Sequence, residues 1–271
     1  MAYVYLTLPD VRGLATANPA TTAFMELRAR EAAREGHALR HVQHWIPYAR
    51  ISQHLKRAVL VAEDDAFWEH EGIDVEQIKR SIEVDWRGGA LRGGSTITQQ
   101  LAKNLYLSPS RDPLRKIREL IIARRLEAEL SKARIFEIYL NVIEWGDGVW
   151  GADAAARTYF GVGAGGLSRE QAALLAGAII NPRMYSPARP PARLLRRQRI
   201  ILARMGSVEP PAPSPIIIPP PPSAPENAPS DTLSPAPEDD ATSPRAPDDA
   251  PSEPPIDPAS PSAVPPPSSN G

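Results

Sequence analysis

The sequence has no cysteine, no long apolar run and no extended alternating pattern. Without cysteine the 271-residue chain has no disulfide framework, thiol nucleophile or cysteine-ligated zinc site. No run of about 18 apolar residues is present, so no segment is predicted to span a bilayer. The missing period-two alternation argues against a large sheet. Apolar residues make up 42% of the chain, which is enough to expect a buried core.

Charge and proline are distributed unevenly along the chain. Residues 207–271 hold 22 of the 31 prolines, ten acidic residues and one basic residue, Arg245. The remaining 206 residues therefore carry 30 basic and 22 acidic residues, a net charge of +8. We expect 207–271 to be a disordered tail with polyproline II character, either a solvated spacer or a docking motif around 215–219. A basic body favours an anionic partner: phosphate, nucleic acid or an anionic membrane.

Helical periodicity dominates the body, which predicts a mainly α protein. Asp74 is a candidate N-cap, Ser168 and Gln171 form a capping box, and Gly206 is a candidate C′ residue. Residues 87–94 are expected to form a glycine-rich loop. We divide the chain into an N-terminal segment with a helix (1–45), a main domain (46–206) and the tail (207–271). Helices are predicted at about 22–35, from 74 through 86, and at 95–105, 114–130, 132–143, 168–180 and 191–205.

A carboxylate-rich run, 63–72, follows the apolar segment 58–62. Glu63 is expected where a buried helix meets a polar turn. A carboxylate in partly apolar surroundings has a raised pKa and can act as a general base or acid. The alternative is an acidic helix end solvated by water.

A second run, 93–104, joins a glycine-rich loop to a helix. A helix N-terminus of this kind offers backbone N–H groups and a favourable dipole to an anion, and Lys103 adds a positive charge. It is not a Walker loop, because Gly-Lys-Ser/Thr is absent. The alternative is an ordinary amphipathic surface helix. The polar residues predicted to share one helical face are Thr96, Gln99, Gln100 and Lys103.

The third candidate is the run 115–119. Arg115 and Lys116 lie four and three residues before Glu119, so all three can face one site. The alternative is a surface ion pair of little energetic value. Taken together, the three runs supply two carboxylates, Glu63 and Glu119, beside Lys103, Arg115 and Lys116. Carboxylate pairs are typical of glycosyl chemistry, and the added cations suit a phosphorylated sugar.

In order along about 46–206, five motifs resemble those of glycosyltransferase family 51, and within it the monofunctional biosynthetic peptidoglycan glycosyltransferases. That domain also forms the N-terminal half of class A penicillin-binding proteins, but Ser-x-x-Lys and Lys-Thr-Gly are absent, so no transpeptidase module is expected. The matching positions are Glu63, Asp64, Phe67, His70 and Gly72, then 93–104, then Arg115, Lys116 and Glu119, then 132–141 with Phe136 in place of the usual leucine, and 151–160.

The resemblance implies a lysozyme-like fold with a small membrane-proximal subdomain. It implies lipid II as substrate and inverting transfer of the growing glycan from undecaprenyl pyrophosphate to the GlcNAc 4-hydroxyl. Glu63 would be the general base, while Lys103, Arg115 and Lys116, helped by the Ser95 end of their helix, would stabilise the diphosphate. No organic cofactor is expected. Glu119 would orient the cations or hold a divalent cation, Mg or Mn.

The remaining motif residues are expected to shape the site. Asp64, Thr96, Gln99, Gln100 and Asn104 would contact the substrate or lock the site. Phe67, His70 and Gly72 would support it structurally.

The resemblance also implies a location at the periplasmic face of the inner (cytoplasmic) membrane. Family members carry a transmembrane helix upstream of the segment matching 3–8. The resemblance therefore implies that 1–45 is a juxtamembrane segment and helix, and that this chain lacks the family's membrane anchor. Expected partners are lipid II, the growing glycan strand, the membrane surface and, through the tail, other wall-synthesis proteins. No nucleic-acid motif is present.

Two other functions compete with the polymerase. A lysozyme-like hydrolase or lytic transglycosylase would cut neutral glycan, which gives no reason for the cations. A scaffold protein would bind lipid II without turnover.

Overall fold

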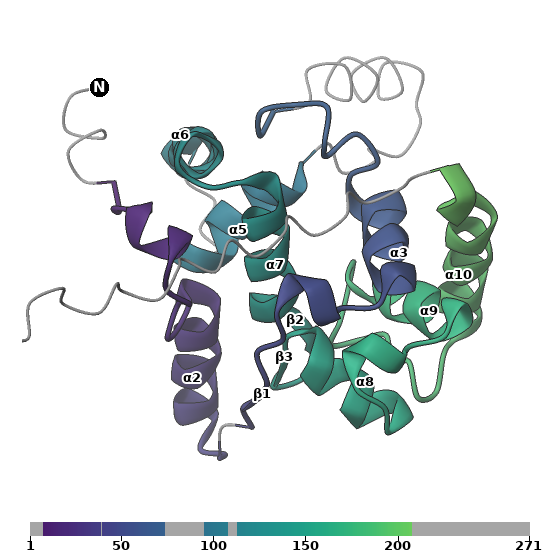
Figure 1. Cartoon of the computed structure of the whole chain (residues 1–271). Helices are drawn as coiled ribbons and strands as arrows, with labels where there is room; N and C mark the ends of the chain where they lie inside the picture. The colour runs from purple at the N-terminus through teal and green to yellow at the C-terminus, as the bar shows by residue number, and fades with distance from the viewer. Residues whose placement is uncertain (1–7, 39, 74–94, 108–112, 208–271) are drawn as a thin grey trace, which may run out of the picture. The chain divides into compact units, whose positions relative to one another are not determined.

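The computed structural model describes residues 8–38, 40–73, 95–107 and 113–207. These residues belong to one compact unit, Met1–Ile216, which is mostly helical, as expected for the lysozyme-like class (Figure 1). The predicted helix from Asp74 and the loop 87–94 lie outside the described residues, as does most of the predicted tail. The boundaries that we place after residues 45 and 206 stay predictions.

The described helices are α2 (Ala23–Glu35), α3 (Gln53–Glu63), α5 (Ile97–Tyr106), α6 (Pro113–Glu129), α7 (Lys132–Val142), α8 (Ala152–Phe160), α9 (Arg169–Ala178) and α10 (Ala192–Arg204), with short 3-10 turns η1 (Arg12–Ala15), η2 (Tyr48–Arg50), η3 (Ala164–Gly166) and η4 (Met205–Ser207). Most of the described helices follow the predicted periodicity, whereas α8 and the 3-10 turns were not predicted.

Side-chain caps fix where these helices begin. The hydroxyls of Thr22, Thr96 and Ser131 each accept a hydrogen bond from a backbone N–H of the first turn, which satisfies a donor without an intrahelical partner. The predicted capping box of Ser168 and Gln171 is confirmed.

Gly206 directly follows the C-cap Met205, as predicted for a C′ residue, but it does not adopt the left-handed conformation typical of a C′ glycine. Gly206 lies inside η4 and is not among the glycines with positive φ. Two features extend the helical path instead: the buried side chain of Met205, and the Ser207 hydroxyl, which donates to the Arg204 carbonyl over 2.6 Å.

Three very short strands form a small sheet that the sequence analysis did not predict. They are β1 (Val42–Gln43), β2 (Glu144–Gly146) and β3 (Val149–Trp150), in the order β1-β3-β2. β1 runs parallel to β3 with Val42 opposite Val149, and β2 runs antiparallel to β3. Strands of two or three residues are too short to show a period of two in the sequence.

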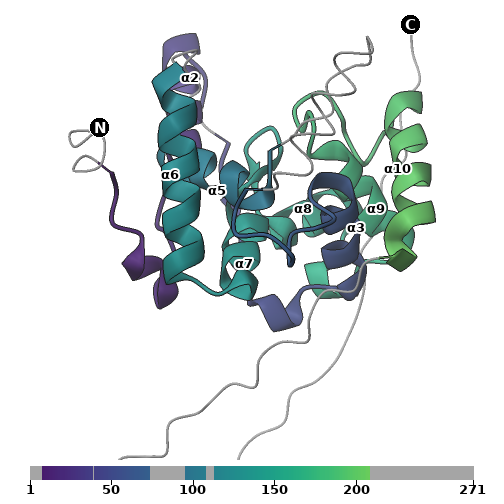
Figure 2. The ribbon, with the colours of Figure 1, turned by 90° about the horizontal axis from the view of Figure 1, so that it is seen from above.

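Two groups of helices pack into one core. α5 packs against α6, α7 and α2, while α9 packs against both α3 and α10 (Figures 1 and 2). The largest buried side chains include Trp145, Trp150 and Tyr139. Glu63 is the last residue of α3, where the α3–α9–α10 group meets α5. The candidate base therefore lies between the two groups.

Candidate active site

Glu63 is a mostly buried carboxylate with a partner on each oxygen. Its side chain is 12% exposed. Oε2 accepts a hydrogen bond from Gln100 Nε2 at 3.0 Å, and Oε1 lies 3.3 Å from Arg197 Nη2. The expectation that Glu63 lies at a helix end in partly apolar surroundings is confirmed. The solvated-acid alternative does not fit this burial.

The surroundings of Glu63 raise its pKa. Burial is the main cause, and it is opposed by the Gln100 hydrogen bond and by the positive charges of Arg197 and Lys103. A carboxylate with a raised pKa is a stronger base when ionised, because it holds a proton more tightly, and its pKa lies closer to neutral pH. Glu63 therefore has the electrostatics of a general base.

Tyr139 sets the direction of the Gln100 amide. Its hydroxyl donates to Gln100 Oε1 at 3.0 Å, which turns the amide nitrogen toward Glu63. Burial raises the pKa of Tyr139 well above its ordinary value, with further contributions from Glu63 and Asp64, so the hydroxyl keeps its proton. Sequence reasoning had assigned no role to Tyr139, although it lies within the fourth motif.

Two adjacent glutamines of α5 connect the first and third motifs. Gln100 reaches Glu63, whereas the Oε1 of Gln99 accepts a hydrogen bond from Lys116 Nζ at 3.0 Å. Successive residues of a helix point about 100° apart, so the two side chains diverge and α5 contacts both functional groups. The structure thus brings the three sequence clusters together around one helix.

Glu119 gathers the predicted cations. It lies 3.1 Å from Arg115 Nη1 and 2.5 Å from Lys116 Nζ, one cation on each carboxylate oxygen. Its side chain is only 4% exposed, against 25% for Arg115 and 46% for Lys116. Because the acid is buried and its two cationic partners are more accessible, their positive charge faces solvent. In an ordinary surface ion pair both partners are exposed. Lys116 also lies 3.4 Å from the Ser95 hydroxyl.

Lys103 lies in the electrostatic field of both carboxylates. Burial lowers its pKa, Glu119 opposes that shift, and the positive charges of Arg115 and Lys116 lower it further. Glu63 also acts on it. Its Nζ lies 5.8 Å from the centre of the Phe24 ring on α2, so the N-terminal helix contributes to the site.

Glu119 does not fit a resident divalent cation. Each of its oxygens is paired with a positive side chain, which opposes the approach of a further cation, and the described residues contain no group of three acidic or histidine ligands that could hold a metal. A requirement for Mg or Mn stays a prediction.

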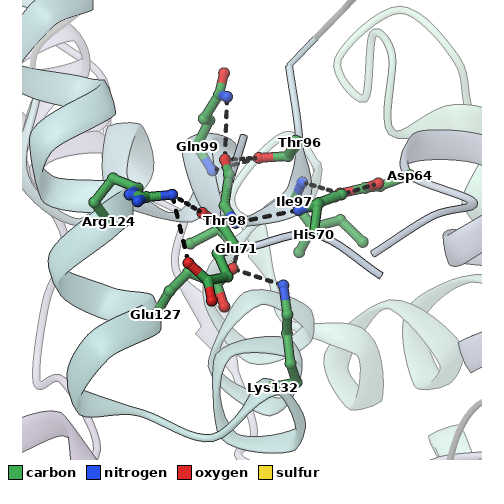
Figure 3. A network of polar contacts seen from close by, with 11 residues as sticks. Asp64, His70, Glu71, Thr96, Ile97, Thr98, Gln99, Arg124, Glu127 and Lys132 are labelled. Atoms are coloured by element: carbon green, nitrogen blue, oxygen red, sulfur yellow. Dashed lines mark hydrogen bonds and ion pairs between the residues drawn. The ribbon is translucent and has the colours of Figure 1, made fainter. Parts of the chain in front are cut away.

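Asp64 locks the first motif to α5 (Figure 3). It is fully buried and accepts from His70 Nε2 at 3.0 Å and from the Ile97 backbone N–H at 2.9 Å. His70 Nδ1 accepts a hydrogen bond from the Gly72 N–H at 3.1 Å. The ring proton is therefore on Nε2, which donates its hydrogen bond to Asp64. Of the two roles predicted for Asp64, this geometry favours locking over substrate contact.

Thr96 and Gln99 hold the other end of this loop. Their side chains donate to the Gly72 carbonyl at 2.7 and 3.1 Å, and both are buried (Figure 3). Gly72 has a φ of +79°, and a Cβ there would lie 3.0 Å from Glu127 Cγ, so glycine is required. Asn104 is also buried and donates back to the Gln100 carbonyl at 2.8 Å.

Lys132, in the fourth motif, joins this network through Glu127. Its Nζ lies 2.8 Å from Glu127 Oε1, which also accepts from the Thr98 hydroxyl (Figure 3). The same ammonium lies 4.4 Å from the centre of the Phe67 ring, which is fully buried and packs against Phe136. Sequence reasoning missed Glu127 and Arg197, because both lie outside the five motifs.

Replacing Asp64 with alanine is expected to destabilise the fold by on the order of 2–4 kcal/mol, because it leaves the Ile97 N–H and the His70 ring without their buried acceptor. Chemical unfolding measures this change. Asp65→Ala is the control, since Asp65 is 45% exposed and pairs with an equally exposed Arg204. Equal stability losses at 64 and 65 would contradict the locking role.

A family model described as Transglycosylase matches residues 31–206. The chain belongs to the transglycosylase family. The relatives include biosynthetic peptidoglycan transglycosylases from three bacteria. That of Dechloromonas aromatica is 50% identical over 195 residues (72% of this chain, 84% of the relative). That of Methylobacillus flagellatus is 52% identical over 197 residues (72% and 85%). That of Aromatoleum aromaticum is 52% identical over 191 residues (69% and 82%).

The family match covers every residue of the transglycosylase site described above, from Glu63 to Arg197, and the part of α2 that follows residue 30. Phe24, which contacts Lys103, lies outside the matched range. Among the described residues, no helix has the length and apolar character needed to cross a membrane.

Proposed function

We propose that this chain polymerises peptidoglycan glycan strands from lipid II, transferring the growing chain from undecaprenyl pyrophosphate to the GlcNAc 4-hydroxyl with inversion. As a member of the transglycosylase family, the chain is a peptidoglycan glycosyltransferase. The single observation that carries the finer proposal is the pairing of one buried carboxylate, Glu63, which contacts Gln100 of α5, with a cluster of cations that is joined to the adjacent Gln99.

Glu63 would supply the base in this reaction. A sugar hydroxyl is a weak nucleophile, and a positioned carboxylate accepts its proton as the new bond to C1 forms. Each oxygen of Glu63 has one protein partner, Gln100 or Arg197, and a carboxylate oxygen accepts more than one hydrogen bond. Both oxygens therefore keep capacity for the acceptor hydroxyl.

The cations would act at the other end of the breaking bond. As the C1–O bond to the lipid diphosphate breaks, its electron pair stays on the diphosphate, which needs positive charge more than a proton. Lys103, Arg115 and Lys116 provide that charge, and Glu119 holds Arg115 and Lys116 in place. Attack and departure on opposite faces of C1 invert its configuration.

The surface beside the cations is compatible with a lipid-linked donor. Leu114 and Ile117 flank Arg115 and Lys116 on α6, and they are 52% and 41% exposed. Exposed aliphatic side chains next to accessible cations suit a diphosphate that carries a long hydrocarbon. We accordingly place the enzyme's action in the cell envelope, at the periplasmic face of the inner membrane, with the membrane surface as a partner.

The direct test offers two substrates to the full chain. Purified lipid II is expected to yield glycan polymer and free undecaprenyl pyrophosphate, and purified sacculi are expected to stay intact. Release of soluble muropeptides from sacculi without polymer from lipid II would show a glycan-cleaving enzyme instead. Binding of lipid II without turnover, in the presence and absence of Mg or Mn, would show the scaffold.

A further inference from the structure

Arg197, on α10, contacts the end of α3 where Glu63 lies. One nitrogen, Nη2, is 3.3 Å from Glu63 Oε1 and 3.3 Å from the carbonyl oxygen of Ala62. The arginine side chain is 30% exposed and that of Glu63 is 12% exposed, so the pair is largely shielded from water. Arg197 is 134 residues from Glu63 and belongs to none of the five sequence motifs.

We propose that Arg197 is a positioning residue that holds Glu63 in place and keeps it ionised for catalysis. This inference rests on the proposed function, because it assigns Arg197 a task only if Glu63 is the base. Arg197 acts through Glu63, so it is not itself a catalytic residue.

The position of Glu63 makes such a partner necessary. Glu63 is the last residue of α3, and the final carbonyls of a helix carry partial negative charge that disfavours an adjacent carboxylate. Burial disfavours the ionised form as well. By contacting both the Ala62 carbonyl and the Glu63 carboxylate, the Arg197 guanidinium offsets both effects at one point.

The packing of α9 against α10 seats Arg197. A Cβ at Gly177 would lie 3.0 Å from Leu194 Cδ1 and 3.7 Å from Arg197 Cγ, so the glycine lets α10 approach closely. The Arg197 Nε is buried without a hydrogen-bond partner among the described residues. Its orientation is therefore set by packing and by the two contacts of Nη2.

The other groups that face Glu63 do not replace this cation. From α5 come Gln100, which is neutral, and Lys103, whose own pKa is lowered by burial. From α7, the protonated Tyr139 acts through Gln100. The buried part of α9 is apolar throughout. The neighbouring acids are engaged elsewhere, Asp64 with His70 and Asp65 with Arg204.

The first test is independent of activity. In the full chain labelled with ¹³C at glutamate carboxyls, the Glu63 signal is assigned by its loss in Glu63→Gln and titrated with pH. Arg197→Gln and Arg197→Met are expected to raise the pKa of Glu63 above its wild-type value. Arg197→Lys is expected to restore it in part, and Arg196→Gln, an exposed neighbour on α10, to leave it unchanged. An unchanged Glu63 titration in either folded neutral variant overturns the proposal.

The second test uses lipid II polymerisation across pH with the same variants. Neutral residues at 197 are expected to lower kcat at pH 7 on the order of tenfold, with little change in KM, and to move the acid limb of the profile to higher pH. If the wild-type enzyme polymerises lipid II and the pH profiles of Arg197→Gln and Arg197→Met match its own, the role of Arg197 is overturned and the proposed function stands. A wild-type chain without polymerase activity would overturn the proposed function.

Discussion

Glu63→Gln is expected to reduce lipid II polymerisation by at least about a hundredfold while the protein stays folded. Glutamine keeps the size of the side chain and an oxygen that accepts from Arg197 or Gln100, but it cannot take a proton from the acceptor hydroxyl. Initial rates of polymer formation measure the loss. The matched control is Glu69→Gln, an exposed acid in the same loop, which is expected to keep the wild-type rate.

The same substitution is expected to leave stability at neutral pH unchanged or higher. Burial raises the pKa of Glu63, so the folded state binds its proton more tightly than the unfolded state does. Ionisation therefore costs stability once the pH exceeds the ordinary pKa of the side chain, and glutamine removes that cost. Thermal unfolding from pH 4 to pH 8 tests this: the variant should gain stability relative to wild type as pH rises.

A Glu63→Gln protein that polymerises at the wild-type rate would end the general-base assignment.

The double substitution Arg115→Gln with Lys116→Gln is expected to lower polymerisation on the order of a hundredfold or more, because the departing diphosphate loses two of its three cations. Both side chains are at least a quarter exposed, but Glu119 is only 4% exposed and loses both positive partners, so a moderate loss of stability is expected beside the larger loss of activity. Rates with lipid II, and binding of a lipid diphosphate without the glycan, separate the two contributions.

A control with the same change in charge is available on α10. Arg193→Gln with Arg196→Gln removes two exposed arginines far from the cation cluster in sequence and is expected to leave the rate near wild type. If instead the 115/116 variant lost stability in step with activity, the ion pairs to Glu119 would be structural, and the diphosphate role would be wrong.

Local patterns were sufficient to predict most of the described helices. Periodicity and caps fixed α2, α5, α6, α7 and α9 to within one or two residues, because each signal lies in neighbouring residues. The end of α10 was predicted to within one residue, but the 3-10 turn η4 that follows it was not, since Met205 packs into the core and the turn continues past Gly206. The small sheet was missed because its strands are held by pairing between β1 and β3, more than 100 residues apart in sequence.

The candidate site divides in the same way. Spacing along α6 predicted that Arg115 and Lys116 would share Glu119, and that geometry is confirmed. Burial of Asp64 and the contact of Arg197 with Glu63 depend on elements that meet only in the folded chain. No pattern within one segment indicates such a contact, so the lock and the α10 partner could come only from the structure.

The most direct measurement of the central claim is a structure of the full chain bound to a non-reactive lipid II analogue that retains its diphosphate. The account predicts diphosphate oxygens within hydrogen-bond distance of Lys103 and of Arg115 or Lys116, and an acceptor 4-hydroxyl within hydrogen-bond distance of a Glu63 oxygen. A diphosphate bound away from these cations, or an acceptor hydroxyl out of reach of Glu63, would contradict it.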